Sequence, residues 1–243
     1  GATLASLAFF SFPFYLSMML VLLSATFIYF VVKEELQPKE SDKKYLEKLK
    51  DVVVSFKRDR TLAIACFQGF SQCSIFVVFT SFLPAILVSS PFFLEKQGLA
   101  TIFSVEFLAF SVSSLIIGRL SDFLGRKPTM ALGICSAILE LIGLYFSNSY
   151  LHVFFLSMLL GASTASVFVT SSLIAADIIP KENMAFQFGA FDALMDTSFL
   201  ISPFIFDLST RIFGTLKVTF LVSSLIAFFA LILLVFQRET SRK

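Results

Sequence analysis

Four carboxylate side chains lie within long apolar stretches of the sequence: Glu106, Glu140, Asp192 and Asp196. If those stretches cross a membrane, each acid is costly to bury and is expected to face a cavity or a polar partner. Asp192 and Asp196 are four residues apart, so on a helix they would share one face. Two neighbouring carboxylates in an apolar environment favour holding one proton between them. This arrangement suits proton coupling.

A second set of polar side chains lies in another apolar stretch, where Gln68 and Gln72 are one helical turn apart. We interpret both residues, like the four acids, as candidates for proton coupling or solute binding. The structural alternative is that each acid pairs with a Lys, Arg or Ser side chain on a neighbouring helix. No Lys or Arg lies deep within any apolar stretch, so a basic partner would have to come from another part of the protein.

The elements that must position these residues are membrane-spanning helices. Charged residues make up 15% of the 243-residue chain, against about 25% in soluble domains, which is too few for a water-facing surface. Apolar stretches of roughly 20 residues, the length that crosses a bilayer, recur along the whole sequence. Within lipid the backbone must satisfy its own hydrogen bonds, so we expect helices rather than short alternating strands.

Short turns rich in Gly, Pro, Ser and Asn separate the apolar stretches. We interpret 1–10 as the end of one helix and 12–32 as the first complete crossing, because Pro13 would break a longer helix. The longest polar stretch, 33–60, comes next and includes a segment that could form a short amphipathic surface helix. Six further crossings are predicted over 61–88, 98–118, 128–147, 151–178, 183–206 and 214–236.

Basic residues are distributed unevenly over the connections between these crossings. If the long polar stretch is cytoplasmic, 16 of the 19 Lys and Arg residues lie on the cytoplasmic side. Because short cytoplasmic connections are enriched in Lys and Arg, we predict that this stretch and the carboxyl terminus are cytoplasmic. The stretch also contains seven acids, a mixture that favours contact with the membrane surface over nucleic-acid binding.

One connection contains a distinctive motif, Gly118-Arg119-Leu120-Ser121-Asp122-Phe123-Leu124-Gly125-Arg126-Lys127-Pro128. Gly125 can supply the positive φ of a tight turn, and Asp122 would lie where the amino terminus of a neighbouring helix can receive its charge. The motif resembles the G-x-L-x-D-x-x-G-R-[KR] cytoplasmic loop of the major facilitator superfamily. The resemblance implies a gating loop made of Gly118, Asp122, Gly125, Arg126 and Lys127. The alternative is an ordinary charged turn.

Two further stretches resemble the same family. Residues 177–191 are similar to the connection between its tenth and eleventh helices. The tail at 238–243 resembles the ending P-E-T-K-G of the family's sugar and metabolite porters, without its proline. The resemblance implies an all-α membrane protein with about seven transmembrane helices, containing the carboxyl-terminal six-helix half of a major facilitator fold. The parts would be a helix end and one complete helix (1–33), a cytoplasmic central loop (34–60), a six-helix bundle (61–237) and a cytoplasmic tail (238–243).

The family resemblance implies a secondary active transporter that moves a small solute by alternating access. The buried acids favour a proton as the coupling ion, with sodium as the alternative. The partners would be that solute, the coupling ion, the lipid bilayer and an amino-terminal half outside this chain, and no nucleic acid. Because the sequence carries no nucleotide-binding, metal-binding or hydrolase motif, we predict no enzyme, no cofactor and no bound metal. The alternative function is a non-transporting membrane scaffold or subunit, or an incomplete fragment of a transporter.

Overall fold

The computed structural model describes residues 18, 19, 21–26, 30, 45–89, 91–181 and 184–240, and it describes 45–49 and 96 by their backbone alone. The chain divides into two units, 1–44 and 45–243, which are described separately. In the first unit, residues 21–26 are helical. Most of the crossing predicted over 12–32 lies outside the described residues.

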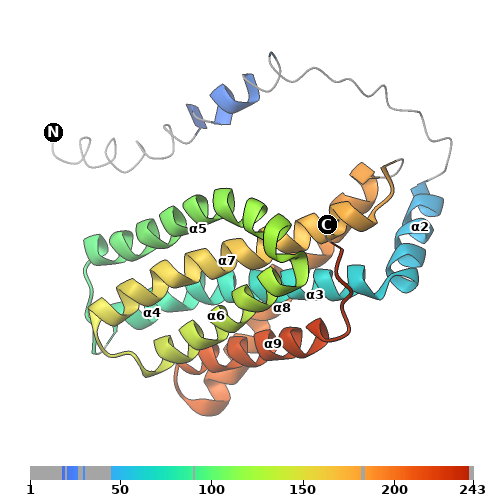
Figure 1. Cartoon of the computed structure of the whole chain (residues 1–243). Helices are drawn as coiled ribbons and strands as arrows, with labels where there is room; N and C mark the ends of the chain where they lie inside the picture. The colour runs from blue at the N-terminus through green and yellow to red at the C-terminus, as the bar shows by residue number, and fades with distance from the viewer. Residues whose placement is uncertain are drawn as a thin grey trace. The chain divides into compact units, whose positions relative to one another are not determined.

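The second unit is a bundle of long helices that pack along one another (Figure 1). Every regular element in its described residues is helical, which confirms the predicted all-α membrane class. Five spans are long and apolar enough to cross a membrane, one of them formed by α3, η1 and α4 together, and α9 is a shorter apolar helix. The elements are α2 (Tyr45–Arg58), α3 (Arg60–Val77), the π-helical turn η1 (Val78–Phe82), α4 (Leu83–Val88), α5 (Lys96–Leu124), α6 (Arg126–Phe146), α7 (Tyr150–Ile178), α8 (Met184–Phe213) and α9 (Val218–Leu234).

Two helices extend further than the apolar pattern predicts. α5 continues past the predicted end at residue 118 to Leu124, and α8 continues past residue 206 to Phe213. A helix does not have to stop where the hydrocarbon core stops, and here both end next to glycines with positive φ, Gly125 at 105° and Gly214 at 68°. Such a backbone is strained for residues with a Cβ atom. The first seven residues of the 118–128 motif are therefore helical, and the turn itself is Gly125 alone.

Small residues allow the helices of the bundle to approach one another closely. A Cβ atom added to Gly133 of α6 would lie 2.8 Å from the Cβ atom of Ser166 on α7, and one added to Gly161 of α7 would overlap the carbonyl oxygen of Glu106 on α5. Such contacts are typical of helix packing in membranes, where dispersion forces replace the hydrophobic effect. They fix the crossings of α7 with α5 and α6.

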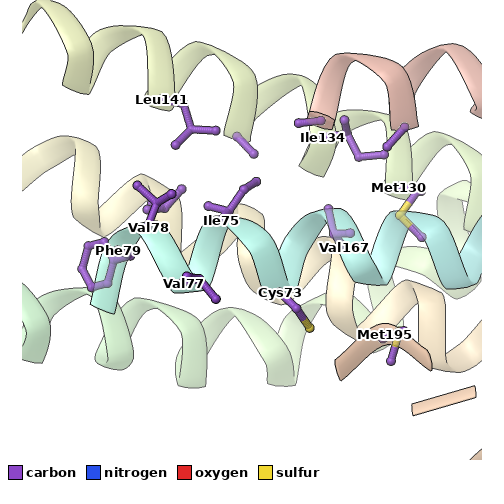
Figure 2. Packing of buried hydrophobic residues seen from close by; sticks show 14 of the residues in the cluster. Cys73, Ile75, Val77, Val78, Phe79, Met130, Ile134, Leu141, Val167 and Met195 are labelled. Carbon is purple, nitrogen blue, oxygen red and sulfur yellow. The ribbon is translucent and has the colours of Figure 1, made fainter. Parts of the chain in front are cut away.

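An apolar core surrounds α3. Figure 2 shows Ile75 and Val78 projecting to one side of this span and Cys73 and Val77 to the other. Met130, Ile134 and Leu141 of α6 belong to the same buried cluster, as do Val167 of α7 and Met195 of α8. The cluster also includes Ile102 of α5 and Phe220 of α9. The core therefore joins α3 to the other long helices of the bundle and holds its polar residues in a defined orientation.

Two helices of the bundle leave their apolar faces uncovered. Of the apolar segments of α5 and α8, 11% and 22% are buried, against 44–61% for the other three spans. Large side chains such as Leu115 on α5 and Phe204 on α8 are 81% and 71% exposed. Lipid or a second set of helices must cover these faces.

α2 lies against the rest of the second unit. It is longer than the short surface helix expected within 34–60, and its Val52 side chain is buried. The ring of Phe56 stacks on that of Phe191 with centroids 6.5 Å apart, and the Ser55 hydroxyl donates to Oε1 of Gln187 at 3.3 Å. Because Phe191 and Gln187 belong to the first turns of α8, α2 joins the starts of α3 and α8.

Candidate functional site

A cavity of about 190 Å³ lies between four helices of the bundle. It contains three of the polar candidates predicted from the sequence, Gln72, Glu106 and Asp196. The rest of its wall is mostly aromatic. The lining residues are Gln72, Cys73 and Phe76 of α3, Glu106, Phe107 and Phe110 of α5, Thr164 and Phe168 of α7, and Asp196 and Phe199 of α8.

The cavity lies well inside the span of these helices. At 1.5 Å per residue, Gln72 is about 18 Å from the first residue of α3, and Thr164 is about 21 Å from that of α7. Glu106 is about 15 Å from the start of α5, a helix of 29 residues, and so lies away from the helix end. The polar groups of the cavity are therefore placed at mid-depth in the bundle.

Glu106 is the most deeply buried acid of the cavity wall. The residue is 2% exposed, and its Oε2 atom has no hydrogen-bond partner among the described residues. The close contact of Gly161 with the backbone of Glu106 holds this turn of α5 against α7. A buried polar atom without a partner is unusual in folded proteins, so Oε2 is open to a proton or a ligand.

Gln72 and Thr164 bind each other across the cavity wall. The Gln72 side-chain amide donates to the Thr164 hydroxyl at 2.7 Å, and both residues are buried. Sequence reasoning missed Thr164, because a hydroxyl residue in the small-residue stretch 161–166 gives the same signal whether it packs or lines a cavity. The pair links α3 to α7 at the level of Glu106.

The two acids of α8 have different surroundings. Asp196 lines the cavity and is exposed, whereas Asp192, one turn away, is half-buried and outside the cavity wall. Both lie on the helix whose apolar face is largely uncovered. The exposed residues of the cavity wall include Asp196 and Phe199 of α8 and Phe107 of α5, so the cavity opens toward the uncovered faces of these two helices.

Two other predicted candidates lie away from the cavity. Both oxygens of Glu140, on α6, accept hydrogen bonds at 2.7 Å, one from Ser136 and one from Ser163 of α7. The Gln68 amide donates to Oε1 of Gln237 at 2.9 Å, beyond the end of α9. Both are buried within the bundle, and the structure places them among protein partners rather than beside the cavity.

A second cluster of polar residues lies at the end of the bundle where α5 passes into α6, which we call the motif end. Its centre is the guanidinium of Arg126, whose side chain is 10% exposed. The Nη1 atom donates to Asp122 and to Ser121, each at 2.6 Å, and Nε donates to Asp177 of α7 at 3.3 Å. Arg126 thus connects the end of α5 with the end of α7.

The carboxyl-terminal tail supplies the acid at the amino terminus of α6. The Glu239 carboxylate accepts from the backbone N–H of Arg126 at 2.8 Å and of Lys127 at 3.0 Å. Asp122, which we expected near a helix amino terminus, pairs with the side chain of Arg126, the first residue of α6, and not with the backbone N–H groups of that helix. The first N–H groups of a helix lack partners within the helix, and Glu239 satisfies two of them. The motif Gly125 makes room for it, since a Cβ atom there would lie 2.8 Å from Glu239 Oε2.

Other contacts of the tail extend this cluster to α3. The Arg238 guanidinium pairs with Asp59, the residue that caps α3, and the Arg238 N–H donates to the Thr61 hydroxyl at 3.3 Å. Lys127 donates to the carbonyl oxygens of Val235 and Gln237 at 3.1 and 2.9 Å. The motif end therefore ties together α3, the α5–α6 turn, α7 and the tail. Glu182, part of the predicted 177–191 resemblance, lies outside the described residues.

The arrangement of apolar helices around a polar cavity, with a charged turn at one end, defines a multi-pass membrane protein. Residues 70–243 match the model of the Major Facilitator Superfamily, and the chain belongs to that family. This confirms the resemblance carried by the 118–128 motif.

Among curated relatives, the chain is similar to the Multi-drug resistance efflux pump PmrA of Streptococcus pneumoniae serotype 4, with 29% identity over 182 residues, which is 73% of this chain and 45% of that protein. It is also similar to the Tetracycline resistance protein, class H, of Pasteurella multocida, with 26% identity over 155 residues, 62% of this chain and 38% of that protein. The chain spans less than half the length of these relatives.

The tail contact at the motif end can be tested by removing its carboxylate. We expect Glu239→Ala to destabilise the full-length protein by about 1 kcal/mol, the usual cost of losing a capping side chain. Thermal unfolding in detergent measures this change. Hydrogen exchange should also become faster at the amides of Arg126 and Lys127.

A matched control is Glu95→Ala, because Glu95 is the acid that directly precedes α5 but its side chain makes no capping hydrogen bond. It should leave the unfolding temperature unchanged. Equal effects of the two substitutions would contradict the assigned role of Glu239.

Proposed function

We propose that this chain is the carboxyl-terminal part of a secondary active transporter, which moves a small solute across the membrane by alternating access. Membership of the Major Facilitator Superfamily supports this proposal. The observation that carries it is the mid-depth cavity with Glu106 and Asp196 in its wall, since transporter sites lie near the bilayer midplane between helical bundles. Two relatives, an efflux pump and a tetracycline resistance protein, favour export.

The amino-terminal half of such a transporter would cover the faces that α5 and α8 leave open. Those are the two least buried spans of the described bundle, and α8 borders the open side of the cavity. A second bundle packed there would close the cavity between two halves, and rocking of one half against the other would expose it to each side in turn.

A proton is the coupling ion in this proposal, with sodium as the alternative. A carboxylate at mid-depth is costly to keep charged and unpaired, so a proton or a cation bound there lowers the cost of closing the site. Asp196 and Glu106 lie in the wall, and Asp192 is one turn from Asp196 on the same helix. Glu140, Gln68 and Gln72 act in this scheme as polar groups that support the helices around the site.

The motif end acts as the gate in this proposal. Gly125, Arg126 and Lys127 are held by contacts to α7 and to the tail, and Asp122 keeps 68% of its side chain exposed. Asp122 and the helical Gly118 are therefore available to the amino-terminal half. Contacts formed in one conformation and lost in the other would bias the equilibrium between them.

We further propose that the motif end is cytoplasmic, as the distribution of Lys and Arg predicts. The test is a cysteine introduced at Phe123, which is 84% exposed at the motif end, compared with one at Leu151, which is 61% exposed at the opposite end. In intact cells a membrane-impermeant maleimide should label Leu151→Cys, and should label Phe123→Cys only after permeabilisation. Labelling of the parent protein measures the background from its own cysteines. Labelling of Phe123→Cys in intact cells would contradict the proposed orientation.

Proton coupling is tested in vesicles that contain the full-length protein. Tetracycline is the first of several solutes to try, because one relative is a tetracycline resistance protein. Coupling free energies of 1–3 kcal/mol correspond to roughly 5- to 150-fold effects, so we expect Asp196→Asn to lower transport driven by a pH gradient about tenfold. Solute exchange without a gradient should be affected less.

The control is Asp207→Asn on the same helix, whose carboxylate pairs with Arg211 at 2.9 Å outside the cavity. It should leave transport intact. Gradient-driven transport that is unchanged in Asp196→Asn would remove the coupling role of Asp196.

A further inference from the structure

The mid-bundle cavity has a wall chemistry that selects one class of solute. Resting on the proposed transport function, we infer that it binds an organic cation with a flat aromatic body. The positive charge lies beside the Glu106 carboxylate, and the ring system lies among the phenylalanines of α3, α5, α7 and α8.

The charge of the solute follows from the acids of the cavity. The cavity wall contains two carboxylates, Glu106 and Asp196, and no Lys or Arg of the described bundle lines it. An anionic solute would meet like charge in an apolar environment, whereas a cation would be attracted by both acids. Glu106 is the closer counter-charge for a bound solute, because it is buried and its Oε2 atom has no partner among the described residues, whereas Asp196 is exposed.

The aromatic body follows from the remaining wall. Five phenylalanines line the cavity, and several of them are held by one another. The ring of Phe76 packs edge-on against Phe107 and Phe199, each at 6.1 Å between centroids, and Phe110 packs against Phe168 at 6.4 Å. Such rings attract both flat aromatic surfaces and positive charge, so they favour a cation that is itself aromatic.

The hydrogen-bonding groups of the wall disfavour a polyhydroxylated solute. The Gln72 amide donates to the Thr164 hydroxyl at 2.7 Å, so the two neutral polar side chains of the cavity are bound to each other. A sugar would have to break this pair and bury its other hydroxyls against phenylalanine, which is unfavourable. The cavity therefore does not support the sugar class suggested by the tail resemblance.

The size of the cavity fits one compact aromatic unit. An engineered protein cavity of about 150 Å³ holds a benzene molecule, and this cavity has about 190 Å³ in the described half of the transporter. It is open toward the uncovered side of α8, so the amino-terminal half would enclose the remainder of a larger solute.

The test compares three probes of nearly equal shape on the full-length protein in detergent. N-methyl-4-phenylpyridinium is a permanent aromatic cation, 4-methylbiphenyl is its neutral counterpart and biphenyl-4-carboxylate is an anion. We expect saturable binding of the radiolabelled cation, which unlabelled cation displaces and the other two probes do not. Glu106→Gln should weaken binding at least about tenfold, because truncating one member of a buried charge pair is costly.

Three controls separate a binding role from a folding role. Glu95→Gln changes an exposed acid before α5 and should bind the cation normally. Glu106→Asp keeps the charge and should retain more affinity than Glu106→Gln at a similar unfolding temperature. Bound cation should also slow alkylation of Cys73, which lies in the cavity wall, while Cys135, which is outside it and exposed, should react at an unchanged rate.

The outcomes distinguish this inference from the proposed function. Equal binding of all three probes, or cation binding that Glu106→Gln leaves unchanged, would overturn the inference. If no aromatic cation binds but the protein in vesicles carries another solute, the solute class is wrong and the transport function stands. If the cation binds through Glu106 but no solute crosses the membrane, the site stands and the transport function is wrong.

Discussion

The close crossing of α5 and α7 positions an acid where the bilayer makes an unpaired charge expensive. Gly161 has no side chain to separate the helices, so the backbone of α5 approaches α7 at Glu106. At this level the Thr164 hydroxyl already accepts a hydrogen bond from Gln72, and Oε2 of Glu106 has no partner among the described residues. Glu140 is the useful comparison, since it is buried to the same 2% but has a serine hydroxyl on each oxygen. The fold satisfies one acid, and the other is the acid to which we assign a proton or a cation in the proposed site.

The same need for partners organises the motif end. Reversing the chain between α5 and α6 within one residue, Gly125, leaves the first N–H groups of α6 without partners in their own helix. Glu239 in the tail accepts hydrogen bonds from these N–H groups. The Arg126 guanidinium donates to both Asp122 and Asp177. A turn that would be a simple connection is thus tied to α7 and to the chain's last described residues. This gives the proposed gate a set of contacts that can form and break together.

Local sequence patterns predicted the helices, whereas long-range contacts determine which side chains face the cavity and which face other helices. The apolar stretches predicted the helices, and the glycine at 125 predicted the turn, where the structure has a positive φ. The extension of α5 to Leu124 was missed because hydropathy marks the membrane and not the helix end. The Glu239 contact joins residues 113 positions apart, and no local signal reveals it. Gln68 and Gln72 share a spacing, yet one binds Gln237 and the other lines the cavity, because packing sets how α3 is rotated.

The central claim is that a solute and a proton use the carboxylates of one cavity. The most direct measurement is proton release when N-methyl-4-phenylpyridinium is added to the full-length protein in weakly buffered detergent solution. The account predicts release from the parent protein that rises and saturates with binding of the cation, and that is absent from Glu106→Gln at concentrations that still saturate it. Binding without proton release across the pH range in which the protein is stable, or equal release from both proteins, would contradict it.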